Sequence, residues 1–442
     1  MFRCGSVVGA LLGLALLVPA TASARGVQGT LDALAASGDL GPELHTRYTR
    51  DWSQARVAVR HLHGYARSEL KGVLSNTWSL ARHDLLARSV TPAFLTIERN
   101  YEWFWVDGNG PAAYGARRTF DGSPLIFEFY PGSGWQIQPL ANFGRLGGLA
   151  ANRRTKPEAL VSYADTLLPL AVERDGFPAF EYYFPWSGGR PGWISGMATA
   201  TGIQALGRVW QRTGQARYRD LAERMLGAFF QRPPNGVRLY RGHGRAHYLQ
   251  YSQAPHLLVG NAFAQSLIAL DEFARASGSS RAALALERGL RQADASLRRF
   301  DTGSWSLYWR RPGTSRGGES DLHYHQLFEG FLGKLCPRFP NGPFCAMRQR
   351  FARYETEPVR IGPLRARAHG RMLRMRVWTS KRGSGRLTIA HGTHVIHTST
   401  FPLERGTHTL ERRLPRGRRT YTIRFEATSL NGLGSSRERT FR

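Results

Sequence analysis

Residues Phe300–Phe331 read FDTGSWSLYWRRPGTSRGGESDLHYHQLFEGF. Turn chemistry at residues 301–303 leads into a short aromatic segment, then a polar Gly/Ser/Arg loop, then a predicted helix. Four side chains that can exchange protons while hydrogen-bonding a sugar or a carboxylate flank this loop: Tyr308, Tyr324, His323 and His325. Gly-rich loops between ordered segments often carry function. The alternative is that the two tyrosines are half-buried packing residues at the edge of a helical core.

On both sides of this stretch, from Gln138 to about Glu355, apolar residues recur with the spacing of an α-helix over segments long enough to form helices. The predicted helices are Leu140–Ala151, Pro157–Glu173, Trp193–Thr213, Tyr218–Gln231, Leu257–Ala276, Arg281–Phe300, Leu322–Leu335 and Ala346–Tyr354. Connections rich in Gly, Pro and Ser separate them. Successive antiparallel helices of this number predict a mostly α fold, an (α/α) barrel of helical hairpins over residues 137–356. Such barrels expose loops at one end around a groove that can hold a chain-like ligand.

The first 24 residues have the layout of a secretory signal peptide. Arg3 precedes an apolar run over residues 7–18, and small residues follow as far as Ala24. The run is too short for a comfortable membrane span. We therefore expect an exported protein that begins near Arg25 and is secreted, extracellular or associated with the cell envelope.

Residues 25–136 are predicted to form a small α/β region. The stretch from Val27 to about Arg88 has a helical pattern. From Pro92 the apolar period changes to two, so that residues 94–105 predict a strand and residues 124–130 predict another.

Residues 357–442 are predicted to form a small antiparallel β-sandwich of immunoglobulin or fibronectin-III type. Leu373, Met375 and Val377 alternate with polar residues, and Gly-containing turns separate several such segments. This region holds 19 basic and 5 acidic residues, a net charge of +14. The charges are either solvated outward faces of strands or a surface that attaches to an anionic polymer.

The whole chain is strongly basic, with 61 Lys and Arg against 32 Asp and Glu and a formal net charge of +29. A strongly positive surface concentrates polyanions. Because export is expected, an acidic polysaccharide or an anionic cell-envelope polymer is the predicted partner, and nucleic acid is not.

Two cysteines remain after the expected signal peptide, Cys336 and Cys345. In an exported protein this spacing predicts a local disulfide. A zinc site would need more ligands than this pair offers nearby. No ligand cluster for a metal is recognised elsewhere in the sequence.

Two further segments share the helical region with the stretch quoted first. They are GWISGMATATGIQALGRVW at Gly192–Trp210 and HYLQYSQAPHLLVGNAFAQSLIAL at His247–Leu270. Together the three resemble the C-terminal domain of D-glucuronyl C5-epimerases, which convert glucuronic to iduronic acid within heparan-type polysaccharides. A weaker fourth match is Tyr130–Leu146, and the β-sandwich lies outside the resemblance.

The resemblance implies a reaction in which the C5 proton of a uronic acid is removed and one is returned to the opposite face. The site must stabilise the enediolate that develops next to the carboxylate, and it must place a proton-transfer group on each face. Tyr324 would serve one face, while Tyr308 and Tyr251 would stabilise or orient the carboxylate and the ring. Seven further residues are predicted to bind substrate: Tyr248, His247, Arg245, Trp193, Asn261, His323 and His325. No cofactor is predicted, although members of the family can hold a calcium ion and can be homodimeric.

One catalytic position departs from the family pattern. Directly before the tyrosine that matches Tyr251 the family places a glutamate, where this chain has Gln250. An amide cannot exchange a proton, and no Asp or Glu occurs between Tyr240 and Leu270. Either His247, His323 or another tyrosine has taken over, or the reaction differs, or catalysis has been lost.

Three alternatives to an epimerase follow. A polysaccharide lyase begins with the same proton abstraction but expels the 4-linked sugar. A non-catalytic glycan-binding protein would have kept the groove and lost its base. A hydrolase would need two carboxylates across a groove, for which the candidates by location are Glu181, Asp301, Glu319 and Asp321.

Overall fold

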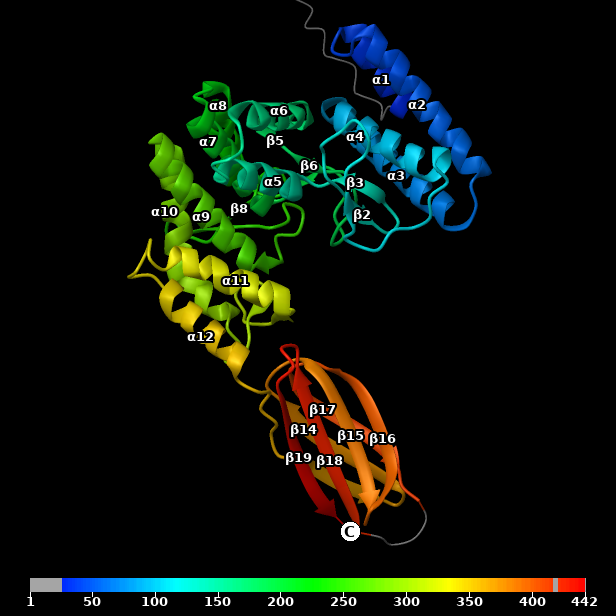
Figure 1. The fold of residues 1–442 in the computed structure, drawn as a ribbon, viewed down its shortest axis with the longest axis vertical. Coiled ribbons are helices and arrows are strands. Elements are labelled where there is room, and N and C mark those ends of the chain that lie inside the picture. The colour runs from blue at the N-terminus through cyan, green and yellow to red at the C-terminus, as the bar shows by residue number, and fades with distance from the viewer. Residues whose placement is uncertain (1–25, 416–419, 442) are drawn as a thin grey trace, which may run out of the picture.

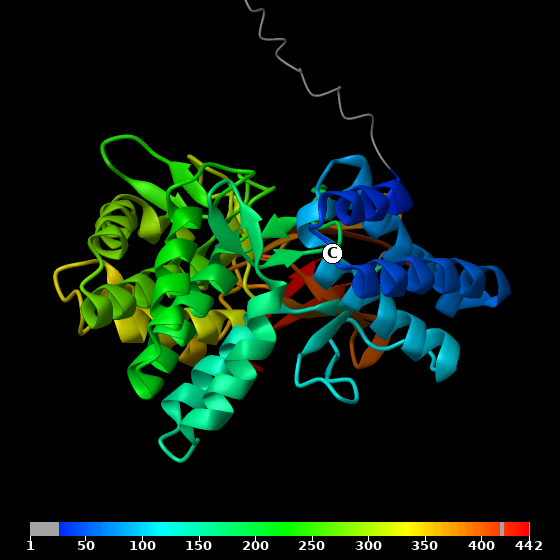
Figure 2. The same cartoon turned by 90° about the horizontal axis from the view of Figure 1, so that it is seen from above.

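The computed structural model describes residues 26–415 and 420–441. The predicted signal peptide, residues 1–24, lies outside the described residues. A group of N-terminal helices, a larger region of paired helices and a C-terminal pair of β-sheets follow one another along the chain (Figure 1). Figure 2 shows the N-terminal helices on one side of the molecule and the paired helices on the other. Within the described ranges, no helix is long and apolar enough to cross a membrane.

The N-terminal region contains four helices followed by a small sheet. The helices are α1 (Val27–Ser37), α2 (Pro42–His61), α3 (Gly64–Arg82) and α4 (Leu86–Tyr101), and a short π-helix, Glu102–Val106, extends α4. The strands are β1 (Arg117–Arg118), β2 (Phe127–Tyr130) and β3 (Gly134–Ile137), hydrogen-bonded in that order. Leu31, Ala55, Val73 and Phe94 are among the residues of the core that these helices share.

The strand predicted for residues 94–105 is wrong, because α4 and the π-helix occupy them. Along α4 the buried positions recur every three or four residues, as at Leu86, Ser89, Ala93, Ile97 and Asn100. That spacing places them on one face of a helix, whereas a strand would bury every second residue. The local alternation of apolar and polar residues is therefore a fragment of a longer helical period.

Two polar residues of the N-terminal helices hold the β2–β3 hairpin in place. Asn100 of α4 exchanges two hydrogen bonds with the backbone of Trp135, each 2.7 Å long. The carboxylate of Glu69, on α3, accepts from the backbone N–H groups of Gly132 and Gly134 at 2.7–2.9 Å. The buried carboxylate of Glu69 thus satisfies the backbone N–H groups of the tight turn of the hairpin, where Gly134 has a φ of +65° that suits glycine.

The middle of the chain consists of eight helices in four pairs. They are α5 (Pro139–Ala151), α6 (Pro157–Leu167), α7 (Gly196–Thr213), α8 (Ala216–Met225), α9 (Gly260–Ser277), α10 (Ser280–Ser296), α11 (Leu322–Leu335) and α12 (Phe344–Thr356). Helices α5, α7, α9 and α11 pack side by side in that order, and each packs against the helix that follows it (Figure 1). The prediction of a mostly helical body built from hairpins is confirmed, whereas closure into an (α/α) barrel stays a prediction.

Short strands precede each helix of the α5, α7, α9 and α11 row. β3 leads into α5, β7 (Trp193–Ile194) into α7, β10 (Leu258–Val259) into α9, and β12 (Gly317–Glu319) into α11. Two helices therefore begin later than predicted, at Gly196 and Gly260, because the residues before them pair with other strands. β7 pairs with β6 (Glu181–Tyr182), and β10 pairs with β11 (Leu307–Arg310), which in turn pairs with β12.

The end of α11 is joined to α12 by a disulfide. Cys336 and Cys345 are bonded in the structure, nine residues apart. The residues between them turn the chain so that α12 packs back on α11.

The C-terminal region is a pair of sheets, as the alternating pattern predicts. Its strands are β13 (Arg365–His369), β14 (Met372–Thr379), β15 (Gly383–His391), β16 (His394–Leu403), β17 (Gly406–Arg413), β18 (Tyr421–Ser429) and β19 (Gly434–Phe441). One sheet has the order β13-β14-β17 and the other β16-β15-β18-β19. Leu373, Met375 and Val377 of the first sheet share a core with Leu387 and Phe425 of the second. The assignment to an immunoglobulin or fibronectin-III type stays a prediction.

Charged side chains join the C-terminal sheets to the helical region. Lys381 donates to the backbone carbonyls of Tyr354 and Glu357 at the end of α12. Arg405 forms an ion pair of 2.7 Å with Glu319, whose side chain is only 4% exposed. Since Glu319 lies on β12 and β12 pairs with β11, this contact reaches the hairpin that carries Tyr308.

We expect Arg405→Gln to destabilise this hairpin by roughly 1–3 kcal/mol, because a buried carboxylate would lose its charged partner. Urea unfolding of Arg405→Gln, Glu319→Gln and the double variant would measure the coupling between the two side chains. The double variant should be more stable than the sum of the two single effects predicts. Strict additivity would show that the ion pair contributes nothing.

Candidate active site

A pocket of about 230 Å³ lies where the N-terminal ends of α5, α7, α9 and α11 meet the β2–β3 hairpin. The residues that line it are Tyr114, Arg117, Glu128, Tyr130, Gln138, Leu140, Tyr182, Phe184, Trp186, Trp193, Met197, Gln250, Tyr251, Val259, Asn261, Tyr308, His323, Tyr324 and Leu327. All four residues predicted as catalytic are among them, as are three of those predicted to bind substrate: Trp193, Asn261 and His323. The remaining predicted residues lie elsewhere.

Three tyrosines from distant parts of the sequence meet on one wall of the pocket. The hydroxyl oxygens of Tyr251 and Tyr308 are 3.1 Å apart and share a hydrogen bond. The rings of Tyr308 and Tyr324 lie with centroids 4.6 Å apart. Tyr324 stands in the first turn of α11, whose N-cap residue Asp321 accepts a 2.7 Å hydrogen bond from the Tyr324 backbone. The helix cap and strand β11 thus bring together the tyrosines predicted from the sequence.

A second polar group enters the pocket from the N-terminal region, and the sequence did not predict it. Glu128 of β2 accepts hydrogen bonds from the hydroxyl of Tyr130 and from Nε of Arg117, each 2.6 Å long. Gln138 extends this series of hydrogen bonds: its side chain donates to the hydroxyl of Tyr130 and accepts from the hydroxyl of Tyr182, both at 2.7 Å. Glu128 is the one carboxylate among the described residues that line the pocket. The sequence could have pointed to Glu128, because it is an acidic residue between Phe127 and Phe129 in a segment that was predicted as a strand.

Desolvation raises the pKa of every tyrosine in this pocket, although Tyr114 and Tyr324 remain 62% and 37% exposed. The six residues are Tyr114, Tyr130, Tyr182, Tyr251, Tyr308 and Tyr324. The main cause of each raised pKa is that a phenolate loses its hydration when the side chain is buried. At neutral pH these hydroxyls are therefore protonated hydrogen-bond donors, and each can act as a base only through its minor phenolate form.

Two amide side chains in the pocket have oxygens without a hydrogen-bond partner. They are Oε1 of Gln250 and Oδ1 of Asn261, both buried. Buried polar atoms are normally paired. Since both oxygens can only accept, they suit hydroxyl groups of a bound ligand.

Aromatic side chains form the rest of the lining. Trp193 stacks on Tyr182 with centroids 4.1 Å apart and an angle of 5° between the rings, and its Nε1 donates to the carbonyl of Phe184 at 2.8 Å. One face of Trp193 is therefore already covered. Tyr251 contacts both Trp193 and Trp186 edge-on or tilted.

Three residues predicted to bind substrate are packing or loop residues outside the pocket. The ring of His247 is fully buried against Phe263, with centroids 4.4 Å apart, and burial lowers its pKa well below the ordinary value. The hydroxyl of the fully buried Tyr248 donates to the carbonyl of Ala285. Arg245 donates to backbone carbonyls of its own loop. The sequence suggested His247 as one replacement for the missing glutamate, but its buried ring lies outside the pocket and is poorly placed for that role.

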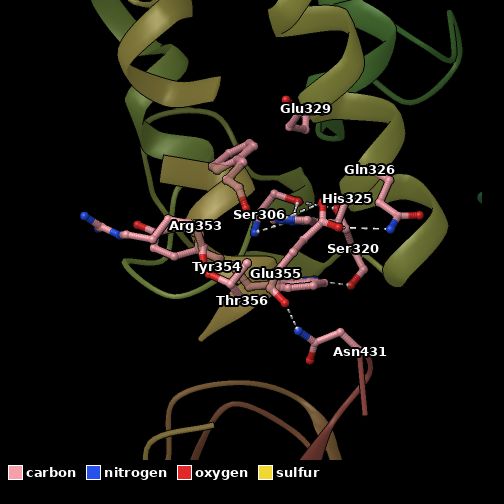
Figure 3. A network of polar contacts seen from close by, with 12 residues as sticks. Ser306, Ser320, His325, Gln326, Glu329, Arg353, Tyr354, Glu355, Thr356 and Asn431 are labelled. Carbon is pink, nitrogen blue, oxygen red and sulfur yellow. Dashed lines mark hydrogen bonds and ion pairs between the residues drawn. The ribbon is translucent and has the colours of Figure 1, made fainter. Parts of the chain in front are cut away.

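His325 also lies outside the pocket, in a buried polar network (Figure 3). Its Nδ1 accepts from the backbone N–H of Ser306 at 3.2 Å, and its Nε2 lies 3.1 Å from the carbonyl of Phe351. These contacts define a neutral ring with the proton on Nε2. The ring stacks on Trp305 with centroids 3.7 Å apart. His325 therefore ties α11 to the segment before β11, and so fixes Tyr324 relative to Tyr308.

Burial lowers the pKa of His325 to about 4. A depressed folded-state pKa contributes stability that is present above the unfolded value of about 6.5 and is lost as the pH falls toward 4. We expect the wild-type protein to lose up to about 3 kcal/mol of unfolding free energy over this window through His325. Urea unfolding between pH 7 and 4 should show a shallower pH dependence for His325→Gln.

The exposed His63 offers the control for that experiment. His63→Gln should keep the pH dependence of the wild type. Identical curves for His325→Gln and the wild type would show that folding does not change the pKa of His325.

The carboxylates considered for a hydrolase do not meet in the pocket. Glu181 is buried and paired with Arg88 and Arg174. Asp301 accepts from the hydroxyl of Tyr354 at 3.0 Å. Among residues 26–415 and 420–441, no cluster of three or more His, Cys, Asp or Glu side chains is placed to hold a metal ion.

Comparison with known proteins identifies the helical region. Residues 176–352 match the family described as D-glucuronyl C5-epimerase C-terminus, which confirms the predicted resemblance for this part of the chain. An uncharacterised protein of Methanocaldococcus jannaschii is 23% identical over 152 residues, which are 34% of this chain and 48% of that protein. The chain thus spans about half the length of that curated relative.

Two solved structures are distantly similar. A cellobiose 2-epimerase from Bacillus thermoamylovorans has 11% identity and a TM-score of 0.40, with 64% of this chain and 75% of that one covered. A D-mannose isomerase has 9% identity and a TM-score of 0.37, with coverages of 67% and 75%. TM-scores of this size do not establish a common fold.

Proposed function

Since residues 176–352 match the C-terminal domain of D-glucuronyl C5-epimerases, we propose that this protein is a carbohydrate epimerase. Its substrate is a uronic acid residue within an acidic polysaccharide, and its reaction exchanges the proton at C5. The observation that carries the proposal is one pocket that is lined both by Glu128 and by the three tyrosines Tyr251, Tyr308 and Tyr324.

The pocket suits the carboxylate of such a sugar. Helices α5, α7, α9 and α11 all contribute residues of their first turns, so their N-terminal ends converge on it. Helix N-termini favour anions through their free N–H groups and their dipoles. Arg117 and the neutral tyrosine hydroxyls add donors. The unpaired oxygens of Gln250 and Asn261 would accept from the sugar hydroxyls.

Proton abstraction α to a carboxylate needs donors aimed at the oxygens on which negative charge develops. Tyr251 and Tyr308 fit this role because their hydroxyls lie 3.1 Å apart and burial keeps both protonated. In the enediolate they would donate to the two oxygens of the former carboxylate.

Two groups that line the pocket would exchange the protons, and we propose that they act on opposite faces of the sugar. Glu128, from β2, takes the C5 proton from one face, and the electron pair of the C–H bond moves into the enediolate. Tyr324, from α11, then gives its phenolic proton to C5 from the other face, which leaves a phenolate and a protonated Glu128. Exchange with water restores both groups, and the reverse reaction uses them in the opposite order. Glu128 thereby supplies the carboxylate that Gln250 lacks.

We also propose the larger organisation of the chain. Its regions are a signal peptide at 1–24, an N-terminal region at 25–136, an (α/α) barrel catalytic domain at 137–356 and an immunoglobulin or fibronectin-III-like domain at 357–442. Export and a homodimeric state remain part of this proposal.

The test is to incubate protein lacking residues 1–24 in deuterated water with a panel of glucuronate- and mannuronate-containing polymers. NMR spectra would be read for deuterium at C5 and for unsaturated uronate ends. Deuterium in unbroken chains is the expected result. Unsaturated ends would make the protein a lyase, and neither signal on a polymer that binds would make it a glycan-binding protein.

A further inference from the structure

The outer face of the β13-β14-β17 sheet carries a concentration of arginine. Along β14, Arg374 and Arg376 point outward while Leu373, Met375 and Val377 are buried. On the neighbouring strands the exposed arginines are Arg365, Arg367 and Arg413. We call these five exposed arginines, Arg365, Arg367, Arg374, Arg376 and Arg413, the arginine face.

The arginines of this face stand directly opposite one another. Arg365 of β13 pairs in register with Arg376 of β14, and Arg367 pairs with Arg374. Like charges directly opposite in a sheet destabilise it. Glu411 of β17 is the one acid opposite these positions, and its ion pair with Arg374 is 3.4 Å long. The strands are held together by their buried faces in spite of this repulsion.

The outer face of the second sheet has the opposite arrangement. There Arg386 of β15 stands opposite Glu426 of β18, and Arg424 of β18 stands opposite Glu438 of β19. Both sheets belong to one chain with the same preference for Arg over Lys. Composition alone would give the two faces the same pattern, so the unbalanced charge is a property of one face.

We propose that the arginine face binds an acidic polysaccharide through its carboxylate or sulfate groups. Arginines two residues apart on a strand are about 7 Å apart, and those on adjacent strands are about 5 Å apart. This spacing gives a flat array of guanidinium groups, each of which can grip an oxyanion with two parallel hydrogen bonds. Trp378, 40% exposed on the same side of β14, adds a ring surface against which a sugar can stack.

The face is separate from the pocket between the helices, and no residue of it lines that pocket. Binding there would hold a polymer on the protein while the pocket acts on one of its residues. The proposal does not depend on the reaction, because a glycan-binding protein without catalysis could use the same face.

The test compares two double variants of the protein lacking residues 1–24. Arg365→Gln/Arg376→Gln removes one opposed pair from the arginine face. Arg386→Gln/Arg424→Gln removes two arginines from the other sheet and changes the net charge by the same amount. The probes are heparin and sodium alginate as acidic polysaccharides, dextran as a neutral one, and double-stranded DNA, all at about 150 mM salt.

We expect the first variant to bind heparin or alginate roughly tenfold more weakly than the wild type and with a shallower salt dependence. The second variant should bind as the wild type does, and dextran should not bind. Equal losses in both variants, or no loss in the first, would overturn the proposal. Binding to DNA that is tighter than binding to either polysaccharide would assign the face to nucleic acid instead.

Two further measurements separate this proposal from the proposed function. A thermal unfolding midpoint of the first variant that equals or exceeds that of the wild type would show that its sheet is intact. Unchanged C5 exchange on short oligosaccharides would show that its pocket is intact. A protein without C5 exchange that still loses polymer binding in the first variant would support the arginine face and contradict only the epimerase.

Discussion

Tyr324→Phe should lower the rate of C5 epimerisation, and of proton exchange from the epimer whose C5 proton faces Tyr324, by about 10²- to 10⁴-fold, the usual contribution of a positioned proton-transfer group. The substitution removes the phenolic proton but keeps the ring, whose contact with Tyr308 at 4.6 Å would be retained. Substrate binding should therefore change little, and the loss should fall on kcat more than on KM. The measurement is deuterium uptake at C5 by NMR, followed separately from each of the two C5 epimers.

Tyr240→Phe provides the matched control, because Tyr240 is 53% exposed and lies outside the pocket. It should retain wild-type exchange. A Tyr324→Phe protein with wild-type kcat would remove Tyr324 from the reaction. A loss confined to KM would make it a binding residue.

Glu128→Gln should have an effect of the same order, since it removes the one carboxylate that the described residues contribute to the pocket. Net conversion needs both proton-transfer groups, so each variant should lose turnover in both directions. Exchange of the C5 proton with solvent, without inversion at C5, needs only the one group that lies on the same face of the sugar as that proton. Glu128→Gln should therefore abolish exchange from one epimer and spare the other, and Tyr324→Phe should do the reverse.

Glu173→Gln is the control for this second variant, because Glu173 is an exposed carboxylate whose partner is Arg224. It should leave exchange unchanged. If Glu128→Gln keeps full activity, the base lies elsewhere and Glu128 serves only to orient Arg117 and Tyr130. If both variants lose exchange from the same epimer, the two groups act on the same face.

The family match covers residues 176–352, which contain α7 to α11 and most of α12, and the sequence resemblance that predicted it rested on local motifs. Helical periods predicted the positions of α5 to α12 well, because each helix buries one face and repeats its apolar residues accordingly. The same reasoning failed at Phe94–Trp105, where a short alternation concealed the longer period of α4. Strands of two residues such as β7 and β10 leave no period at all, so they were absorbed into the helices that follow them.

The sequence by itself determined the helical body, the alternating C-terminal sheets and the three tyrosines of the pocket, since burial pattern and motif are local properties of the chain. Only the tertiary structure decided which carboxylate shares the pocket with those tyrosines. Glu128 reaches the pocket because Asn100 and Glu69 hold the β2–β3 hairpin against α4 and α3. His247 and His325 do not reach the pocket, because tertiary packing buries both rings in the core. Such contacts join residues far apart in the chain, and no local pattern records them.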